Sequence, residues 1–204
     1  MNMAHGEIRL DHKVILGMVT DGASVLDLGC GEGELLSILE KEKKVRGQGI
    51  EFSEQAIYSC VEKGLSVYHG DIDTGLSEYG DGSFDYVILN ESLQQVWKSG
   101  VVLNEALRVG RKVIVGFPNF GYYSVRLQVF FGGRTPVTPS LPYMWYDTPN
   151  VHFISISDFE EYCKNRGVSV LDSVFIRKNS VTRILPNLFA DTGIFMISKT
   201  PSPP

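Results

Sequence analysis

The sequence predicts a single α/β domain built on a mostly parallel β-sheet. Three observations lead to this fold class. The 204 residues suit one domain with a substantial core, and apolar β-type runs alternate with helical patterns through the first half of the chain. A glycine-rich turn at residues 29–33 joins the first of these runs to the first helix. Because parallel neighbours need crossover connections, this alternation indicates right-handed βαβ units.

Each element of the first half has its own signal. The run 24–28 ends in glycines, and the run 84–89 is apolar on successive residues, as expected of a strand buried on both faces. Ser53 can cap the helix that follows residue 51. The expected strands are 24–28, 44–51, 65–68, 84–89 and 111–116, and the expected helices are 34–43, 53–63 and 93–109.

In the last third of the chain the alternation of expected strands and helices ends. A helix is expected over 157–166, capped by Ser157 and ended by Gly167. Two further strands, 168–176 and 193–198, have no long helix between them, which favours an antiparallel pair.

Composition narrows the classes of function. A net charge of −5 and a pI of about 5.4 argue against a nucleic-acid partner, which usually needs a concentrated basic surface. The apolar runs are too short to span a membrane and no signal-peptide order is seen, so a cytoplasmic location is expected. Three widely spaced cysteines predict neither a disulfide framework nor a metal site. One domain is expected over 1–204, with a helical segment at 1–23 and a disordered tail at 201–204.

Residues 117–153 form an unusual connection, with ten aromatic residues, five of the nine prolines and few charges. Such a segment is either a lid or interaction surface, or an inert aromatic cover over the sheet edge. The residues expected to contact a substrate or partner are Arg126, Arg134, Trp145 and Tyr146. The two arginines could equally anchor the loop to its own carbonyl groups.

The sharpest chemical signal is the run Val-Leu-Asp-Leu-Gly-Cys-Gly-Glu-Gly at residues 25–33. Its three glycines let the backbone turn tightly and approach a ligand closely. A dinucleotide fingerprint would need a glycine at the position of Glu34. Together with Asp27 and Glu32, Glu34 would oppose a pyrophosphate, whereas the same acids would attract a sulfonium ligand that carries an amino group.

Two further acids follow the next strands. Glu51 ends the second expected strand, where a carboxylate can accept both hydroxyls of a ribose. Asp71 follows the third, and its side chain could take an adenine amino group. Parallel strands present their carboxyl ends at one edge of the sheet, so these acids are expected to line one ligand site.

These motifs resemble, in order, those of class I S-adenosylmethionine-dependent methyltransferases. They are residues 25–33, Gly49-Ile-Glu51, Gly70-Asp71 and Phe84-Asp-Tyr-Val-Ile-Leu-Asn90. A closer resemblance, to the MetW family of methionine biosynthesis proteins, covers nearly the whole chain. The segments that carry it are Arg9-Leu-Asp11, Glu91-Ser-Leu-Gln-Gln-Val96, Gly116-Phe-Pro-Asn-Phe-Gly121, Gly133-Arg-Thr-Pro-Val137, Leu141-Pro-Tyr-Met-Trp-Tyr-Asp-Thr-Pro-Asn150 and His152.

The resemblance implies a Rossmann-like class I methyltransferase fold, with a mostly parallel seven-stranded sheet and an antiparallel edge strand. It also implies an S-adenosylmethionine site. There the glycine loop would border the methionine moiety, Glu51 the ribose and Asp71 the adenine, with Asn90 beside the methyl-transfer position. The residues expected at this site are Asp27, Gly29, Cys30, Gly31, Gly33, Glu51, Phe52, Asp71, Ile72 and Asn90.

Two hypotheses for function stay open. The first is methyl transfer to a small molecule, for which Asn90 and His152 are the catalytic candidates, although His152 better suits a structural hydrogen bond. Glu91, Gln94 and Gln95 either line the acceptor side or begin an ordinary helix. The second, implied by the resemblance, is a non-catalytic partner or activator of a MetX-type homoserine O-acyltransferase. A Ser-His-Asp acyltransferase is disfavoured because no Gly-x-Ser-x-Gly is present.

Overall fold

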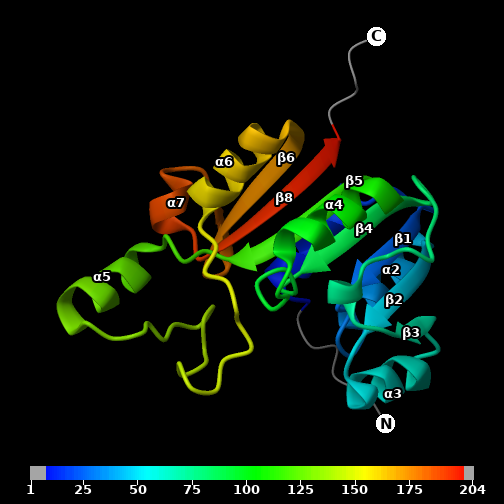
Figure 1. Ribbon diagram of the computed structural model, residues 1–204, viewed down its shortest axis with the longest axis horizontal. Coiled ribbons are helices and arrows are strands. Elements are labelled where there is room, and N and C mark those ends of the chain that lie inside the picture. The colour runs from blue at the N-terminus through cyan, green and yellow to red at the C-terminus, as the bar shows by residue number, and fades with distance from the viewer. Residues whose placement is uncertain (1–7, 200–204) are drawn as a thin grey trace.

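The computed structural model describes residues 8–199, which form one eight-stranded sheet flanked by helices (Figure 1). The strands are β1 (Ser24–Leu28), β2 (Arg46–Glu51), β3 (Val67–His69), β4 (Phe84–Asn90), β5 (Gly110–Pro118), β6 (Val168–Arg177), β7 (Ser180–Thr182) and β8 (Thr192–Lys199). The helices are α1 (Leu10–Met18), α2 (Glu34–Lys43), α3 (Glu54–Glu62), α4 (Ser99–Val109), α5 (Tyr123–Gly132), α6 (Ile156–Arg166) and α7 (Pro186–Phe189), with a 3-10 turn, η1, at Ile72–Thr74.

The expected helical segment at 1–23 contains α1. Its residues 1–7, and the tail expected at 201–204, lie outside the described residues. Within residues 8–199, no helix has the length and apolar character needed to cross a bilayer.

The strand order is β3-β2-β1-β4-β5-β8-β6-β7. Strands β1 to β5 pair in parallel, and β8 runs antiparallel to both β5 and β6. The antiparallel pair expected near the C-terminus is therefore present. The sheet has eight strands rather than the seven expected. The additional strand is β7, which was not expected because it is three residues long and only forms a hairpin with β6. The order reverses at β1, between β2 and β4, which is where open α/β sheets bind ligands.

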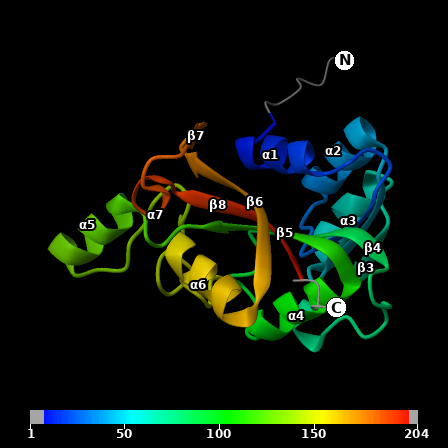
Figure 2. The same ribbon diagram turned by 90° about the horizontal axis from the view of Figure 1, so that it is seen from above.

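Two apolar layers enclose the sheet. Helices α1, α2 and α3 cover one face, and α4 and α6 cover the other (Figure 2). On the second face Phe117 of β5 stacks on Phe195 of β8 and packs against Phe159 of α6, at ring-centroid distances of 5.9 and 5.1 Å. This continuous core holds the carboxyl ends of β1, β2 and β4 in fixed positions, as a ligand site at that edge requires.

Two helices begin at other residues than the sequence predicts. Ser155, rather than Ser157, caps α6, because Asp158 completes a reciprocal capping box with it. The helix expected from residue 93 begins only at Ser99. Residues 92–98 instead form turns, because the carboxylate of Asp73 accepts the backbone N–H groups of Trp97 and Lys98.

The aromatic connection 117–153 contains a helix, α5, that no sequence pattern predicted. Only Val125 of α5 is buried, so the helix lacks the apolar-in, polar-out periodicity by which helices are recognised. It ends at Gly133, whose φ of 57° is left-handed. A small cluster of Tyr122, Val125 and Leu141 packs the base of α5, while the rest of the helix projects beyond the sheet (Figures 1 and 2).

Candidate cofactor-binding cleft

Two cavities lie at the carboxyl ends of the central strands and share residues of the glycine loop. The larger, about 620 Å³, lies between the glycine loop, residues 50–53, residues 70–73 and residues 91–97. The smaller, about 270 Å³, lies between the glycine loop, α1 and the end of β4. Together they form a cleft at the point where the strand order reverses, as the sequence predicts.

The glycine loop needs glycine at each of its three positions, for two different reasons. Gly29, Gly31 and Gly33 all have positive φ, at 74°, 54° and 75°. A Cβ atom at Gly33 would lie 2.9 Å from Sγ of Cys60 and against the side chain of Leu65. At Gly31 a Cβ atom would meet nothing within 4 Å, because this residue faces the open cleft. A side chain at position 33 would therefore clash with the core, whereas the absence of a side chain at Gly31 keeps the cleft open to a ligand.

Alanine substitutions at these two glycines are expected to separate stability from binding. Gly33→Ala adds a left-handed alanine and a clash, and should lower the free energy of unfolding by roughly 2–5 kcal/mol. Gly31→Ala should cost only about 1–2 kcal/mol but place a methyl group in the cleft and weaken ligand binding more strongly. Thermal unfolding and titration with S-adenosylmethionine measure both effects. The opposite ranking in either assay would contradict these assignments.

Glu51 closes the glycine loop from the neighbouring strand. Its Oε2 accepts the Gly31 N–H at 2.8 Å, and its Oε1 accepts the N–H groups of Phe52 and Ser53 at 2.9 and 2.8 Å. These bonds hold the carboxylate at the cleft wall, where the sequence predicts a ribose-binding acid. Phe52 lines the same wall with most of its ring exposed. Cys30 lines the smaller cavity and packs its thiol beside Gly49.

Asp27 is the most deeply buried acid of the cleft, with 3% of its surface exposed. Burial, reinforced by the negative charge of Glu51, raises its pKa to about 7. No hydrogen bond to its carboxyl group is formed within residues 8–199. A cationic ligand in the smaller cavity, which Asp27 lines, would favour the ionised form.

The turn after β3 forms the adjoining wall, next to Glu51. Asp71 and Ile72 line the larger cavity, as expected, and Oδ1 of Asp71 accepts the Asp73 N–H at 2.9 Å. Asp73 was not identified from the sequence. Its two carboxylate oxygens accept the N–H groups of Trp97 and Lys98 at 2.9 and 2.8 Å, which ties this wall to the loop after β4. Trp97 consequently lies at the rim, 76% exposed.

A second group missed by sequence reasoning comes from the N-terminal helix. Arg9 bonds both Asp11 and Glu91 at 2.8 and 2.9 Å, and Asn90 donates Nδ2–H to Asp11 at 2.9 Å. Burial works to raise the pKa of Asp11, but the Asn90 hydrogen bond and the charges of His12 and Arg9 outweigh it, so the pKa is lowered. Asn90 is thus held as a positioning residue at the end of β4. The Arg9-Leu-Asp11 motif was the signal that could have revealed this network.

The loop after β4 carries polar groups that the protein leaves unpaired. Ser92 Oγ and Gln94 Oε1 are buried and have no hydrogen-bond partner within residues 8–199. Ser92 is one of the residues that line the larger cavity, beside Gly29, but its hydroxyl oxygen is itself buried. The backbone carbonyl oxygen of Gln94 accepts the N–H groups of Val151 and His152, which fixes the end of the aromatic connection against this loop.

The other predicted site residues lie apart from the cleft. A ring nitrogen of His152 lies 3.3 Å from the Trp97 carbonyl oxygen, and the residue lines neither cavity. Arg126 donates to the carbonyl oxygens of Gly121 and Asn187, which is the anchoring alternative. Arg134 and Trp145 line a separate groove against α5, and Tyr146 packs edge-on against Trp145.

Comparisons with known proteins agree with this geometry. The family described as "Methionine biosynthesis protein MetW" matches residues 9–197. A bifunctional methionine biosynthesis protein MetXA/MetW of Rhodopirellula baltica is 36% identical over an alignment 200 residues long, and the alignment covers 92% of this chain. The chain spans only 32% of the length of that relative.

Two solved structures show the same fold at low sequence identity. A Haloferax volcanii methyltransferase in complex with the Trm112 methyltransferase activator has a TM-score of 0.69 at 18% identity. A SAM-dependent methyltransferase of Thermotoga maritima also has a TM-score of 0.69, at 16% identity. Each alignment covers 93% of this chain and 88% of the other. The fold is therefore the Rossmann-like class I methyltransferase fold, and the chain belongs to the MetW family of methionine biosynthesis proteins.

Proposed function

We propose that this chain binds S-adenosylmethionine in the cleft between the glycine loop and the loop after β4, and that it transfers a methyl group to a small molecule. The observation that carries the proposal is the hydrogen bond from the Gly31 N–H to the carboxylate of Glu51. A fixed carboxylate lies beside a glycine whose missing side chain leaves the cleft open.

The residues present fit this cofactor. Glu51 would accept the ribose hydroxyls, Asp71 and Ile72 would hold the adenine, and the acids around the smaller cavity would attract the cationic methionine end. When bound, S-adenosylmethionine would supply an electrophilic methyl carbon, which an acceptor nucleophile held in line would attack while the carbon–sulfur bond breaks and S-adenosylhomocysteine leaves.

Residues of this chain contribute orientation rather than a dedicated base. The amide of Asn90 has no basic atom, and His152 lines neither cavity, so neither would remove a proton from an acceptor. Gln95 and Trp97 line the larger cavity and would surround an acceptor on the side away from the glycine loop.

Calorimetric titration tests the binding step, and labelled cofactor tests the reaction. Wild-type protein should bind S-adenosylmethionine saturably with one site per chain. In a cell extract, a small-molecule fraction should then acquire label from methyl-labelled cofactor. Binding without any label transfer would contradict the methyltransferase reaction but leave the cofactor site standing. An absence of binding would contradict both.

A second function is favoured by the Rhodopirellula baltica relative. There a domain similar to this chain is part of the same polypeptide as a MetXA region, as its name states. Fusion keeps two domains at high effective concentration, and an unfused pair needs a binding surface for the same purpose. We propose that this chain associates with a homoserine O-acyltransferase of the MetX type. Co-purification and a changed acyltransferase rate on mixing would support the association, and the lack of both would contradict it.

A further inference from the structure

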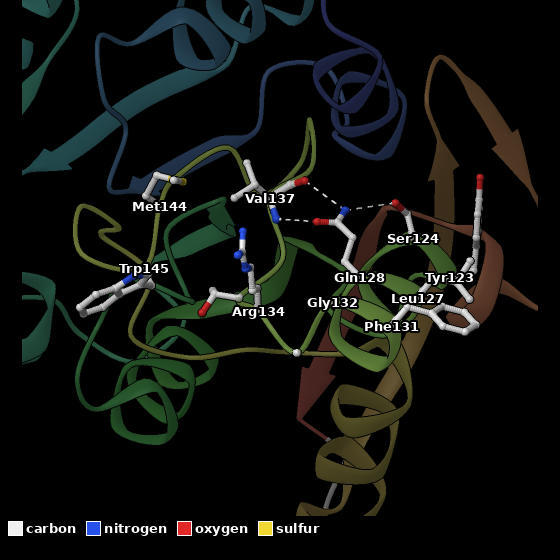
Figure 3. Close-up of a pocket in the computed structure, with 12 residues that line it drawn as sticks. Tyr123, Ser124, Leu127, Gln128, Phe131, Gly132, Arg134, Val137, Met144 and Trp145 are labelled. Atoms are coloured by element: carbon white, nitrogen blue, oxygen red, sulfur yellow. Dashed lines mark hydrogen bonds between the residues drawn. The ribbon is translucent and has the colours of Figure 1, made fainter.

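The segment 123–146, called the arm below, projects beyond the sheet at the end of the molecule opposite α3 (Figures 1 and 2). It consists of α5 and the chain that returns alongside it. Between them lies a groove of about 1000 Å³, larger than either cavity of the cofactor cleft. Figure 3 shows the two walls, with Leu127 and Phe131 of α5 on one side and Met144 and Trp145 on the other.

The arm exposes large apolar side chains close together. Phe130 and Phe131 are 81% and 78% exposed, and Trp145 is 71% exposed. Leu127 and Met144 are each about half exposed and line the same groove. Single exposed apolar residues are ordinary, but a contiguous patch with several aromatic rings marks an interaction surface. Tryptophan and other aromatic side chains are also the residues that carry most binding energy in interfaces.

The arm is held in shape by polar contacts of its own. Gln128 exchanges two hydrogen bonds of 3.1 Å with the backbone of Val137, which fixes the returning chain against α5 (Figure 3). Arg126 anchors the first turn of α5 to the carbonyl oxygen of Gly121. Because the groove is formed before any partner arrives, little conformational entropy is lost on binding. The exposed rings contribute little to this scaffold, so their removal should leave it folded.

The groove carries a single formal charge. Arg134 is the one ionisable cation among its lining residues, and its guanidinium lies between the two walls (Figure 3). It forms no ion pair or hydrogen bond with any residue in 8–199. A guanidinium on an apolar surface is best matched by a carboxylate bound in bidentate geometry. The complementary occupant is therefore a segment in which an acidic residue is flanked by apolar side chains.

We propose that this groove is the docking surface for the MetX-type acyltransferase subunit, which would insert such an acidic, apolar segment beside Arg134. The inference rests on the second function proposed above. We choose this partner, rather than a second copy of the chain, because the Rhodopirellula baltica relative joins a MetXA and a MetW region in one polypeptide. The groove is lined by residues of the arm alone and shares none with the cofactor cleft, so both can be filled together.

The test measures affinity between the purified chain and a MetX-type acyltransferase by biolayer interferometry. Phe131→Ala, Trp145→Ala and Arg134→Glu should each weaken association by at least about tenfold, as expected of central interface residues. Tyr58→Ala, an exposed aromatic on α3 at the far end of the molecule, is the matched control and should bind like wild type. Lys41→Glu on α2 is the control for charge reversal. Circular dichroism checks that every variant is folded.

Three outcomes would overturn the proposal, and they are distinguishable. If wild type binds and the arm variants bind equally well, the partnership stands but its surface lies elsewhere. If wild type does not bind the acyltransferase at all, the partnership and the docking surface both fail, whereas the cofactor site is untouched. If sedimentation shows that wild type self-associates and that Phe131→Ala abolishes this, the occupant is a second copy of the chain.

Discussion

A Glu51→Ala variant is expected to lose at least about 100-fold in affinity for S-adenosylmethionine, because two charge-assisted hydrogen bonds to a ribose are worth roughly 3 kcal/mol or more. The substitution also frees the Gly31 N–H, which Glu51 Oε2 accepts at 2.8 Å, so the glycine loop loses its support from β2. Calorimetry of the two proteins at equal concentration measures the change in Kd directly.

Two further variants separate the role of Glu51 in binding from its role in the fold. Glu51→Gln keeps one acceptor oxygen for the backbone N–H groups, replaces the other with an NH2 donor and removes the charge, and should bind with intermediate affinity. Glu42→Ala removes an exposed acid from α2 and should leave affinity unchanged. A Glu51→Ala protein that keeps the wild-type Kd and unfolds at the same temperature would remove Glu51 from the cofactor site.

The parts of this fold that follow local rules could be predicted from the sequence. The run from Val25 to Gly33 places a buried strand, a positive-φ turn and a helix start within nine residues, so its geometry depends little on the rest of the chain. Glu51 was identified for a similar reason, because an acid at a strand end lies at the ligand edge of any parallel sheet.

The parts that were missed depend on contacts between distant segments. Asp73 sets the start of α4 from 24 residues away, and Asp11 holds Asn90 from 79 residues away. Neither long-range contact is visible in a local pattern, even though Asp11 itself lies in a recognisable motif. The helix α5 was missed for the opposite reason, since its apolar residues face solvent and conceal its period. The exposed apolar residues that conceal the period of α5 are the ones on which the proposed docking surface rests.

The cofactor cleft and the aromatic connection are physically joined, although their cavities are separate. The backbone carbonyl oxygen of Gln94 accepts hydrogen bonds from the N–H groups of residues 151 and 152, and Gln94 lies in the loop that forms one wall of the cleft. Any movement of this loop on ligand binding would therefore reach the end of the connection that also contains the arm. Reciprocal coupling between cofactor and partner would follow if both sites bias the same loop.

An Asp27→Asn variant is expected to be more stable than wild type at pH 8 while binding S-adenosylmethionine less well. Burial and the charge of Glu51 raise the Asp27 pKa from 3.8 to about 7 in the folded protein. Between these two values the folded state keeps a proton that the unfolded state has released, so the free energy of unfolding falls as pH rises. Well above pH 7 the full cost of ionising Asp27 in the folded protein is present, on the order of 4 kcal/mol, and the neutral amide avoids most of it.

Binding should follow the opposite trend. A cationic ligand favours the ionised carboxylate, so wild-type affinity should rise roughly tenfold between pH 6 and pH 8 as Asp27 loses its proton. Asp27→Asn removes this dependence and leaves only the titration of the ligand itself, which makes it the control for that effect. Thermal unfolding at pH 5 and pH 8, with titrations at pH 6 and pH 8, measures both trends.

A wild-type affinity whose pH dependence matches that of Asp27→Asn would show that Asp27 does not meet the cationic end of the ligand. A variant less stable than wild type at pH 8 would show that the carboxylate is better satisfied than its burial indicates. If both trends hold, the cleft keeps a destabilising buried acid whose ionised form is needed only when a cation is bound. A residue that lowers stability but raises affinity indicates a ligand site that is in use, rather than a site that the fold retains without a ligand.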